Sequence, residues 1–338
     1  MITDRYEPMD MTIWQGRIDS TNNYDAFRWH QHIQQLDLTI TETPSPKGAF
    51  GFALLGFCSD EGIRRNQGRI GAGAGPNAIR KELANLPCHF SQKTLLFDAG
   101  NILCLDGKLE ASQEALAVAV AKIRRLGLFP LVMGGGHEVA FGHYQGHKKF
   151  MVEHQQEPAI GILNFDAHFD LRAVLPEGGS SGTMFRQIAN ESLHTGLDFN
   201  YLCFGLQESG NTRELFKTAK ELGASHILAT DVISKGENYV IKELDDFLKT
   251  TKNIYITICA DVFAAAFAPG VSAIQPLGLN PLDVVKYLEY VLNSGKVIGF
   301  DIAEVSPSFD RDKATVSLAK VLFFSVVNSI CRLKGLDE

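Results

Sequence analysis

Short apolar stretches alternate along the chain with amphipathic stretches that repeat with the period of a helix. Eight apolar stretches have the length of strands: "AFGFALLGF", "TLLFDAG", "LFPLVMGGG", "AIGILNFDAH", "FNYLCFGL", "HILAT", "NIYITICADV" and "VIGFDIAEV". Segments whose apolar residues repeat with the period of a helix lie between several of these strands, for example at 76–86, 109–127 and 280–295. This alternation predicts an α/β fold in which helices cover both faces of a mainly parallel sheet of about eight strands.

Residues 1–50 differ from the rest because they are polar and punctuated by proline, as in "ETPSPKG". We interpret them as an irregular N-terminal lead-in. We find no low-complexity linker, composition break or internal repeat in the remaining sequence. It therefore predicts a single α/β domain over residues 1–338.

Composition narrows the class of partner. The chain is 45% hydrophobic and 21% charged, which is typical of globular proteins, and its net charge is -7. Without a long basic run, we expect no nucleic-acid partner and no membrane partner, but a small molecule. Neither a signal-peptide pattern nor an apolar run of about 18 residues is apparent. Six cysteines without metal-ligand or disulfide spacing favour a reducing cytoplasm.

Four of the predicted strands end in ionisable side chains. In chain order these are His137; then Asp166, His168 and Asp170; then Cys259 and Asp261; then Asp301 and Glu304. A lone aspartate after a strand is more often a helix cap. Because the carboxyl ends of parallel strands meet at one edge of a sheet, however, four such endings predict a common site there.

The stretch "DAHFD" at 166–170 is the densest part of this group. If it is extended, side-chain alternation points Asp166, His168 and Asp170 the same way. Two carboxylates and an imidazole would then share a small space, and a divalent cation would compensate for their charge, with Mn²⁺ preferred over a structural zinc. The alternatives are a hydrogen-bonded loop without metal and a purely structural role for His137.

Three blocks, "GGGHE" at 134–138, "NFDAHFD" at 164–170 and "ICADVFAAAFAPG" at 258–270, resemble in order the signature blocks of the arginase/agmatinase (ureohydrolase) family. The stretches "GRIGAGAGPNAIR" at 68–80 and "FDIAEVSPSFD" at 300–310 resemble its flanking motifs. The resemblance implies a three-layer α/β/α fold with a mainly parallel eight-stranded sheet. It also implies two Mn²⁺ ions per subunit and a homo-oligomer.

The resemblance assigns roles to individual residues. His137, Asp166 and Asp170 would hold one metal ion, while Asp166, His168 and Asp261 would hold the other, so that Asp166 bridges both. Asp170 would also orient the attacking water and carry its proton to the leaving amine.

Glu304 corresponds to the family carboxylate that binds the cationic carbon–nitrogen group. Cys259 stands where the family has a second bridging aspartate. It is either a thiolate ligand, which would favour Zn²⁺ or Fe²⁺ over Mn²⁺, or a small buried hydrophobe, so the number and identity of the metals stay open. Ala264 replaces another frequent aspartate that is not a primary ligand.

Substrate specificity is expected in the loops. Arg172, Ser181 and Arg186 follow the second block, and Ser181 stands where agmatinases usually have histidine. Arginines pair with carboxylates and repel a cationic tail, which favours a di-acid with an amidine head. The resemblance thus implies hydrolysis of N-formimidoyl-L-glutamate to L-glutamate and formamide, in histidine degradation. Taken singly, each arginine is more ordinarily a surface or ion-pair residue.

Two other functions compete with this interpretation. One is hydrolysis of a guanidino compound by an enzyme of the arginase, agmatinase or guanidinobutyrase type, which would release urea. The other is a degenerate, metal-free family member with a binding role, which the changes at Cys259 and Ala264 suggest.

Overall fold

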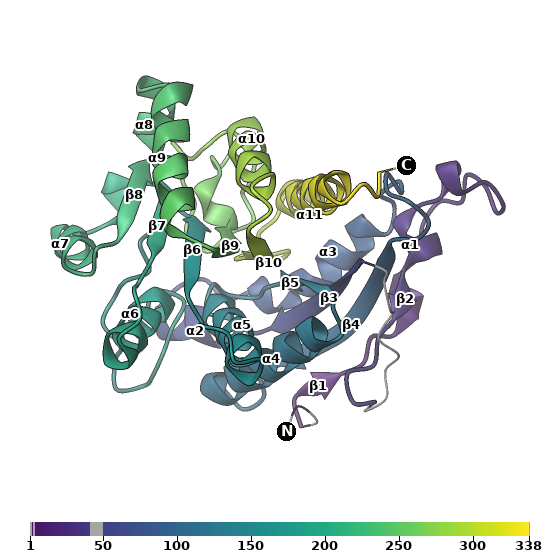
Figure 1. Cartoon of the computed structure of the whole chain (residues 1–338), viewed down its shortest axis with the longest axis horizontal. Helices are drawn as coiled ribbons and strands as arrows, with labels where there is room; N and C mark the ends of the chain where they lie inside the picture. Colours follow the sequence, from purple (N-terminus) through teal and green to yellow (C-terminus); the bar gives the residue numbers. More distant parts are fainter. Residues whose placement is uncertain (1, 3, 41–49, 338) are drawn as a thin grey trace.

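The structure is a computed structural model that describes residues 2, 4–40 and 50–337, and the ten strands in this part of the chain form one sheet (Figure 1). Its eight long strands are β3 (Gly51–Cys58), β4 (Leu95–Leu103), β5 (Phe129–Met133), β6 (Ile160–Phe165), β7 (Tyr201–Leu206), β8 (Ser225–Leu228), β9 (Asn253–Cys259) and β10 (Val297–Ala303). They lie in the order β4-β3-β5-β10-β9-β6-β7-β8, and all neighbours in this series are parallel. Each coincides with a predicted strand.

Helices cover both faces of the sheet and complete three layers (Figure 1). One face carries α3 (Gly75–Leu83), α8 (Ala229–Ser234), α9 (Glu237–Thr250), α10 (Pro281–Leu292) and α11 (Ala314–Leu333). The other carries α4 (Leu109–Arg125), α5 (Val139–Glu153), α6 (Met184–Thr195) and α7 (Arg213–Glu221). Leu54 of β3 packs into the first core and its neighbour Leu55 into the second, which explains why the strands are apolar along their whole length. The predicted α/β/α fold is confirmed.

Helix α11 is long and apolar enough, with a mean hydropathy of 1.7, to cross a membrane, but 67% of that stretch is buried inside the protein. It packs against α3 and α10, and its Phe323 ring meets Phe300 of β10 at 5.4 Å between centroids. These contacts are those of a core helix.

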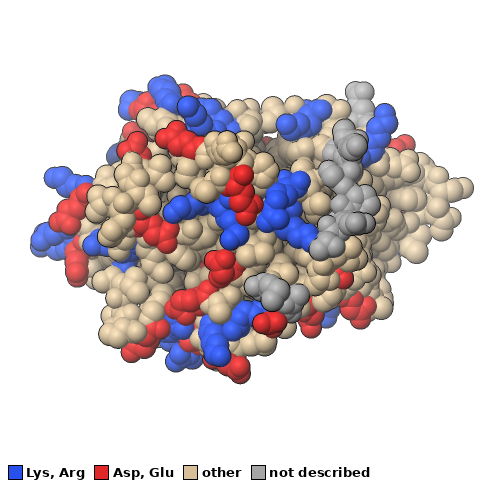
Figure 2. Space-filling view, turned by 60° about the horizontal axis from the view of Figure 1, so that its bottom comes forward, with Lys and Arg blue, Asp and Glu red and all other residues tan. Residues whose placement is uncertain are grey.

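Basic and acidic side chains lie interspersed on the face drawn in Figure 2. This mixture agrees with the modest net charge of -7. The expectation that nucleic acid is not a partner stays a prediction.

The N-terminal lead-in covers the edge of the sheet. Strand β1 (Tyr6–Glu7) is antiparallel to β4, β2 (Gln34–Gln35) is parallel to it, and α1 (Trp29–His32) lies between them in the chain. The segment 41–49, which contains the whole of the proline-punctuated "ETPSPKG", lies outside the described residues. Since an open edge strand invites pairing with other chains, this covering protects β4.

A buried ion pair fastens the lead-in to the sheet. Asp98 of β4 accepts hydrogen bonds from Arg80 Nε of α3 at 2.7 Å and from Trp14 Nε1 of the lead-in at 2.8 Å. The side chains of Arg80 and Asp98 are both 0% exposed. Removing one partner would leave the other charge buried and unpaired.

We therefore expect Asp98→Ala to lower the free energy of unfolding by roughly 3–5 kcal/mol, measured by urea titration followed by circular dichroism. Asp246→Ala is the matched control, because Asp246 pairs with Lys242 and Lys249 at the surface and its loss should change stability little. Equal effects of the two substitutions would contradict the assignment.

Candidate active site

The ionisable side chains gather at the carboxyl edge of four strands that lie side by side in the sheet as β5-β10-β9-β6. These strands are far apart in sequence, yet each ends in the loop that carries part of the cluster. His137 follows β5, Glu304 follows β10, Cys259 ends β9 and Asp166 follows β6. The parallel topology therefore brings the predicted residues to one place.

Glycines allow the loop that carries His137 to pass close to its neighbours. A Cβ atom at Gly135 would lie 2.0 Å from the backbone oxygen of Ser59, and one at Gly136 would lie 2.0 Å from Glu138 Oε2. The Gly136 amide donates to Ser59 oxygen at 2.9 Å. A side chain at Gly135 would push this loop away from the end of β3 and displace the imidazole of His137, while one at Gly136 would collide with the side chain of Glu138.

The tautomer of His137 follows from two hydrogen bonds behind it. Thr257 donates its hydroxyl proton to the buried carboxylate of Asp301 at 2.5 Å, so its oxygen is left to accept a hydrogen bond. His137 Nε2 lies 2.9 Å from that oxygen and therefore carries the proton. Asp301 is itself held by Tyr255 and by His143, whose Nδ1 lies at 2.6 Å.

This arrangement directs the other nitrogen of His137 at two carboxylates. Nδ1 lies 3.0 Å from an oxygen of Asp166 and 3.0 Å from an oxygen of Asp170. A lone pair facing two carboxylates is repulsive unless a proton or a cation lies between them. In the protein alone burial lowers the pKa of His137, but the two carboxylates outweigh burial and raise it well above its ordinary value. The geometry is therefore suited to a cation.

Asp166 is the centre of the cluster. It is 0% exposed, and burial by itself raises the pKa of its carboxyl. Hydrogen bonds to His137 and His168 outweigh burial and hold that pKa below its ordinary value. Burial and the charge of Asp166 raise the pKa of Asp170 to about 6 and also raise that of Asp261. The cluster thus has more carboxylate than its imidazoles neutralise.

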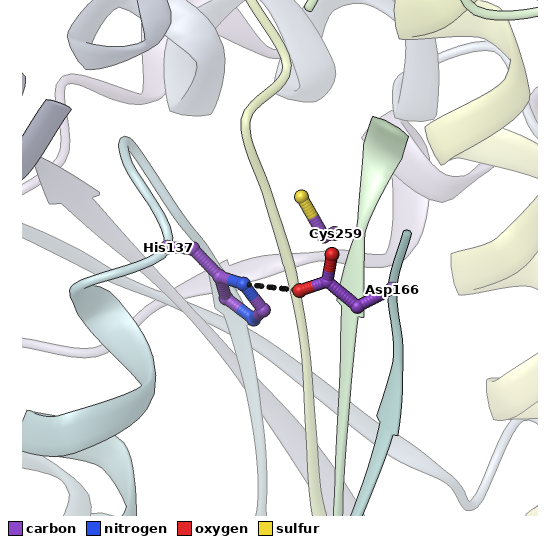
Figure 3. Close-up of side chains that lie close together, drawn as sticks. All are labelled: His137, Asp166 and Cys259. Carbon is purple, nitrogen blue, oxygen red and sulfur yellow. Dashed lines mark ion pairs between the residues drawn. The ribbon is translucent and has the colours of Figure 1, made fainter. Parts of the chain in front are cut away.

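Two groups of side chains have ligand atoms within 4.8 Å of one another, and Asp166 belongs to both. The first, which we call the sulfur position, consists of His137, Asp166 and Cys259 (Figure 3). The second, which we call the oxygen position, consists of Asp166, His168 and Asp261, with His168 Nδ1 at 3.1 Å from Asp261. Their nitrogen, oxygen and sulfur atoms fit two divalent cations that share one carboxylate.

The chain does not follow the predicted extended path from 166 to 170. Strand β6 ends at Phe165, the chain bends, and Asp170 has a φ of 50°. His168 consequently contacts Asp166 and Asp261, whereas Asp170 turns to His137. The expectation that alternation aligns these side chains was wrong; a turn brings them together.

Glu304 also has a positive φ, of 65°, a conformation that is strained for a residue other than glycine. Its Oε1 accepts from the backbone amide of His137 at 3.1 Å, while its Oε2 has no hydrogen-bond partner among the described residues. Burial and the nearby charges of Glu138 and Asp261 raise the pKa of Glu304 well above its ordinary value. A cationic group beside Oε2 would offset these effects and favour the ionised carboxylate.

These residues face a cavity of about 320 Å³. Its lining includes His137, His168, Asp170, Cys259, Asp261 and Glu304. Arg172 and Ser181 also line it, and the Ser181 hydroxyl accepts from Asn66 at 3.3 Å. Arg186 lies instead in an adjoining cavity of about 460 Å³, which Arg172 also lines. The structure thus brings Arg172 and Ser181 to the reacting end but not Arg186.

Sequence reasoning missed several residues of the site. Thr257 lies within the otherwise apolar strand β9, and His143 lies on α5 outside any recognised motif. Asn211 and Ser272 line the cavity from loops after β7 and β9. The sequence signal for Thr257 was a lone polar residue two positions before Cys259, on the same face of the strand.

The chain is similar in sequence and in fold to known proteins. The sequence profile of the Arginase family matches residues 50–328. A formimidoylglutamase from Clostridium tetani (strain Massachusetts / E88) is 52% identical over 337 residues, which cover 99% of each chain. A Trypanosoma cruzi formiminoglutamase solved with Mn²⁺₂ has a TM-score of 0.73 and 27% identity, over 83% of this chain and 93% of that one. The formimidoylglutamase from Bacillus subtilis subsp. subtilis str. 168 shares the fold, with a TM-score of 0.76 and 22% identity over 94% and 96% of the two chains.

Glu138 provides a test of the buried charges. Its Oε1 accepts from Ser59 and from the Gly62 amide, and burial raises its pKa to about 7. The folded state thus holds a proton that the unfolded state releases near the ordinary value of 4.5. The protonated Glu138 therefore stabilises the folded state fully below pH 4.5, and this contribution to the free energy of unfolding is lost as the pH rises to about 7.

Between pH 5 and 8 the free energy of unfolding should fall in both metal-free proteins. We expect the fall to be smaller in Glu138→Gln than in the wild type, by on the order of 3 kcal/mol. Gln keeps the acceptor oxygen but cannot ionise. Urea unfolding at several pH values in the presence of a chelator measures the difference. Parallel pH profiles for the two proteins would refute it.

Proposed function

The chain belongs to the arginase family, and from that membership we propose that it hydrolyses N-formimidoyl-L-glutamate to L-glutamate and formamide. The observation that carries the choice of substrate is the similarity, over nearly the whole of both chains, to a protein named for this activity. Water adds to the amidine carbon, the bond from that carbon to the glutamate nitrogen breaks, and a proton moves to that nitrogen.

The residues that would hold the cations are those of the sulfur and oxygen positions, with Asp170 beside the first. Cations bound there would lower the pKa of a water molecule and polarise the amidine. We propose Mn²⁺ at the oxygen position, whose two carboxylates and one imidazole suit that ion. The Mn²⁺ in the Trypanosoma cruzi relative supports this assignment.

Asp170 and Glu304 would perform the proton transfer and the binding of the head group. Asp170 lines the cavity, and its carboxylate lies 3.0 Å from His137 Nδ1, so it is placed beside the proposed cations, where it can accept a proton from an attacking water. It would take a proton from the attacking water and deliver it to the leaving nitrogen. Glu304 would accept hydrogen bonds from the amidine through Oε2.

Arg172 would recognise the acidic tail of the substrate. It is exposed and lines both cavities, so its guanidinium can pair with a carboxylate that extends away from the reacting head. A cationic tail such as that of agmatine would be repelled. The glutamate skeleton with a one-carbon amidine also supports a role in histidine degradation, which we propose to occur in the cytoplasm.

The first test is a substrate panel. Protein loaded with Mn²⁺ should release formamide and glutamate from N-formimidoyl-L-glutamate, and should release no urea from arginine, agmatine or 4-guanidinobutyrate, with products measured by chromatography. Urea release with a higher kcat/KM than formamide release would establish a guanidino-compound hydrolase instead. Inactivity with all four substrates, after loading with Mn²⁺, Zn²⁺ or Fe²⁺, would establish a non-catalytic member.

The second test concerns the tail. Arg172→Ala should raise KM for N-formimidoyl-L-glutamate roughly tenfold to a hundredfold, because one charged hydrogen-bonding partner is lost, while kcat changes less. Arg186→Ala is the matched control, since Arg186 lines only the adjoining cavity and its loss should alter KM much less. The reverse ranking in steady-state kinetics would move the tail-binding role to Arg186.

A further inference from the structure

The cysteine at the end of β9 differs from the other buried cysteines in its surroundings. Cys88 and Cys331 pack into one hydrophobic cluster, and Cys203 packs into another. Cys259 is only 2% exposed, yet it belongs to none of the hydrophobic clusters that the described residues form. It is therefore not placed as a small hydrophobe would be.

The path of β9 directs the sulfur to the metal-binding cluster. Thr257 and Cys259 are two residues apart on a strand, so their side chains lie on the same face. The Thr257 hydroxyl reaches His137 on that face. Sγ of Cys259, a nitrogen of His137 and an oxygen of Asp166 all lie within 4.8 Å of one another (Figure 3).

We propose that Cys259 binds a divalent cation through its thiolate, so that the sulfur position selects a softer cation, such as Zn²⁺ or Fe²⁺, than the oxygen position. The proposal rests on the proposed function only in that the same cluster binds the cations. Thiolate and imidazole prefer Zn²⁺ and Fe²⁺, whereas carboxylates suit Mn²⁺. Binding releases the thiol proton to solvent. The two positions would thus share Asp166 and differ in the softness of their other ligand atoms, because only the sulfur position has a thiolate.

Cobalt provides a spectroscopic test that is independent of activity. Metal-free full-length protein titrated with Co²⁺ should develop a near-ultraviolet sulfur-to-cobalt charge-transfer band, which saturates when a single ion per chain is bound at the sulfur position. Cys259→Ser should abolish the band and still bind Co²⁺ at the oxygen position. The matched control is Cys104→Ser, which removes a partly buried thiol from outside the cluster and should keep the band. A band that persists in Cys259→Ser would overturn the proposal.

A measurement on the wild type covers the case in which Cys259→Ser does not fold. Zinc-edge X-ray absorption of protein loaded with a single Zn²⁺ should show one sulfur neighbour at about 2.3 Å. A first shell of nitrogen and oxygen alone would overturn thiolate ligation. Because this measurement uses only the wild-type protein, it does not depend on whether a variant folds.

Metal competition tests the selectivity. Because Zn²⁺ binds most ligand sets more tightly than Mn²⁺, wild-type protein is equilibrated with a large, constant excess of Mn²⁺ over Zn²⁺ and should then retain both metals, measured by mass spectrometry. Cys259→Asp, which makes the ligand set oxygen-rich, should lower the ratio of Zn²⁺ to Mn²⁺ about tenfold or more. An unchanged ratio would refute the selectivity.

The outcomes distinguish this inference from the proposed function. Formamide release without any sulfur signature would retain the function and overturn the role of Cys259. A sulfur signature without formamide release under any metal would support the role of Cys259 and overturn the function.

Discussion

Asp166 is a carboxylate with no exposed surface, and the arrangement of the carboxyl edge depends on compensating for its charge. An unpaired buried carboxylate is disfavoured by several kcal/mol. Its compensation comes from His137 after β5 at 3.0 Å and from His168 in its own loop at 3.4 Å. Since these imidazoles also face Asp170 and Asp261, neutralising one charge brings in two more carboxylates. The excess negative charge makes cation binding a property of the cluster and not of any one residue.

A second buried carboxylate, Asp301, lies behind His137 and fixes how that residue can act. Its partners Thr257, Tyr255 and His143 all direct a hydrogen at it, so the Thr257 oxygen is left as an acceptor. The Thr257 hydroxyl therefore determines which nitrogen of the His137 imidazole carries the proton. Partners of this kind commonly orient metal-binding histidines and tune their basicity. The same face of β9 thus supports the cluster through Thr257 and contributes Cys259 to it.

The sequence was sufficient to predict the eight strands and the common edge, because buried parallel strands are continuous apolar runs and their carboxyl ends must meet. Sequence reasoning could not reveal that β5, β10, β9 and β6 are neighbours, since pairing order depends on long-range packing. It also missed the turn after β6, because aspartate adopts a positive φ only occasionally and the residue type of Asp170 is therefore a weak signal for one. Thr257 was overlooked, and Asp301 was expected at the end of a strand although it lies within β10, because a buried polar residue in a strand gains its meaning only from its partner.

The site has a buried part, in which amino-acid substitutions are costly, and an exposed part, in which they are tolerated. Asp166, Asp301 and His137 are each at most 1% exposed and satisfy one another, so a substitution at one leaves an uncompensated group at the others. Arg172 is exposed, and replacing it leaves no buried charge behind. A fold built in this way can keep its hydrolytic chemistry while its loops adapt to different substrate tails. Cys259 belongs to the buried part, so its thiol bears on the choice of metal and not on the choice of substrate.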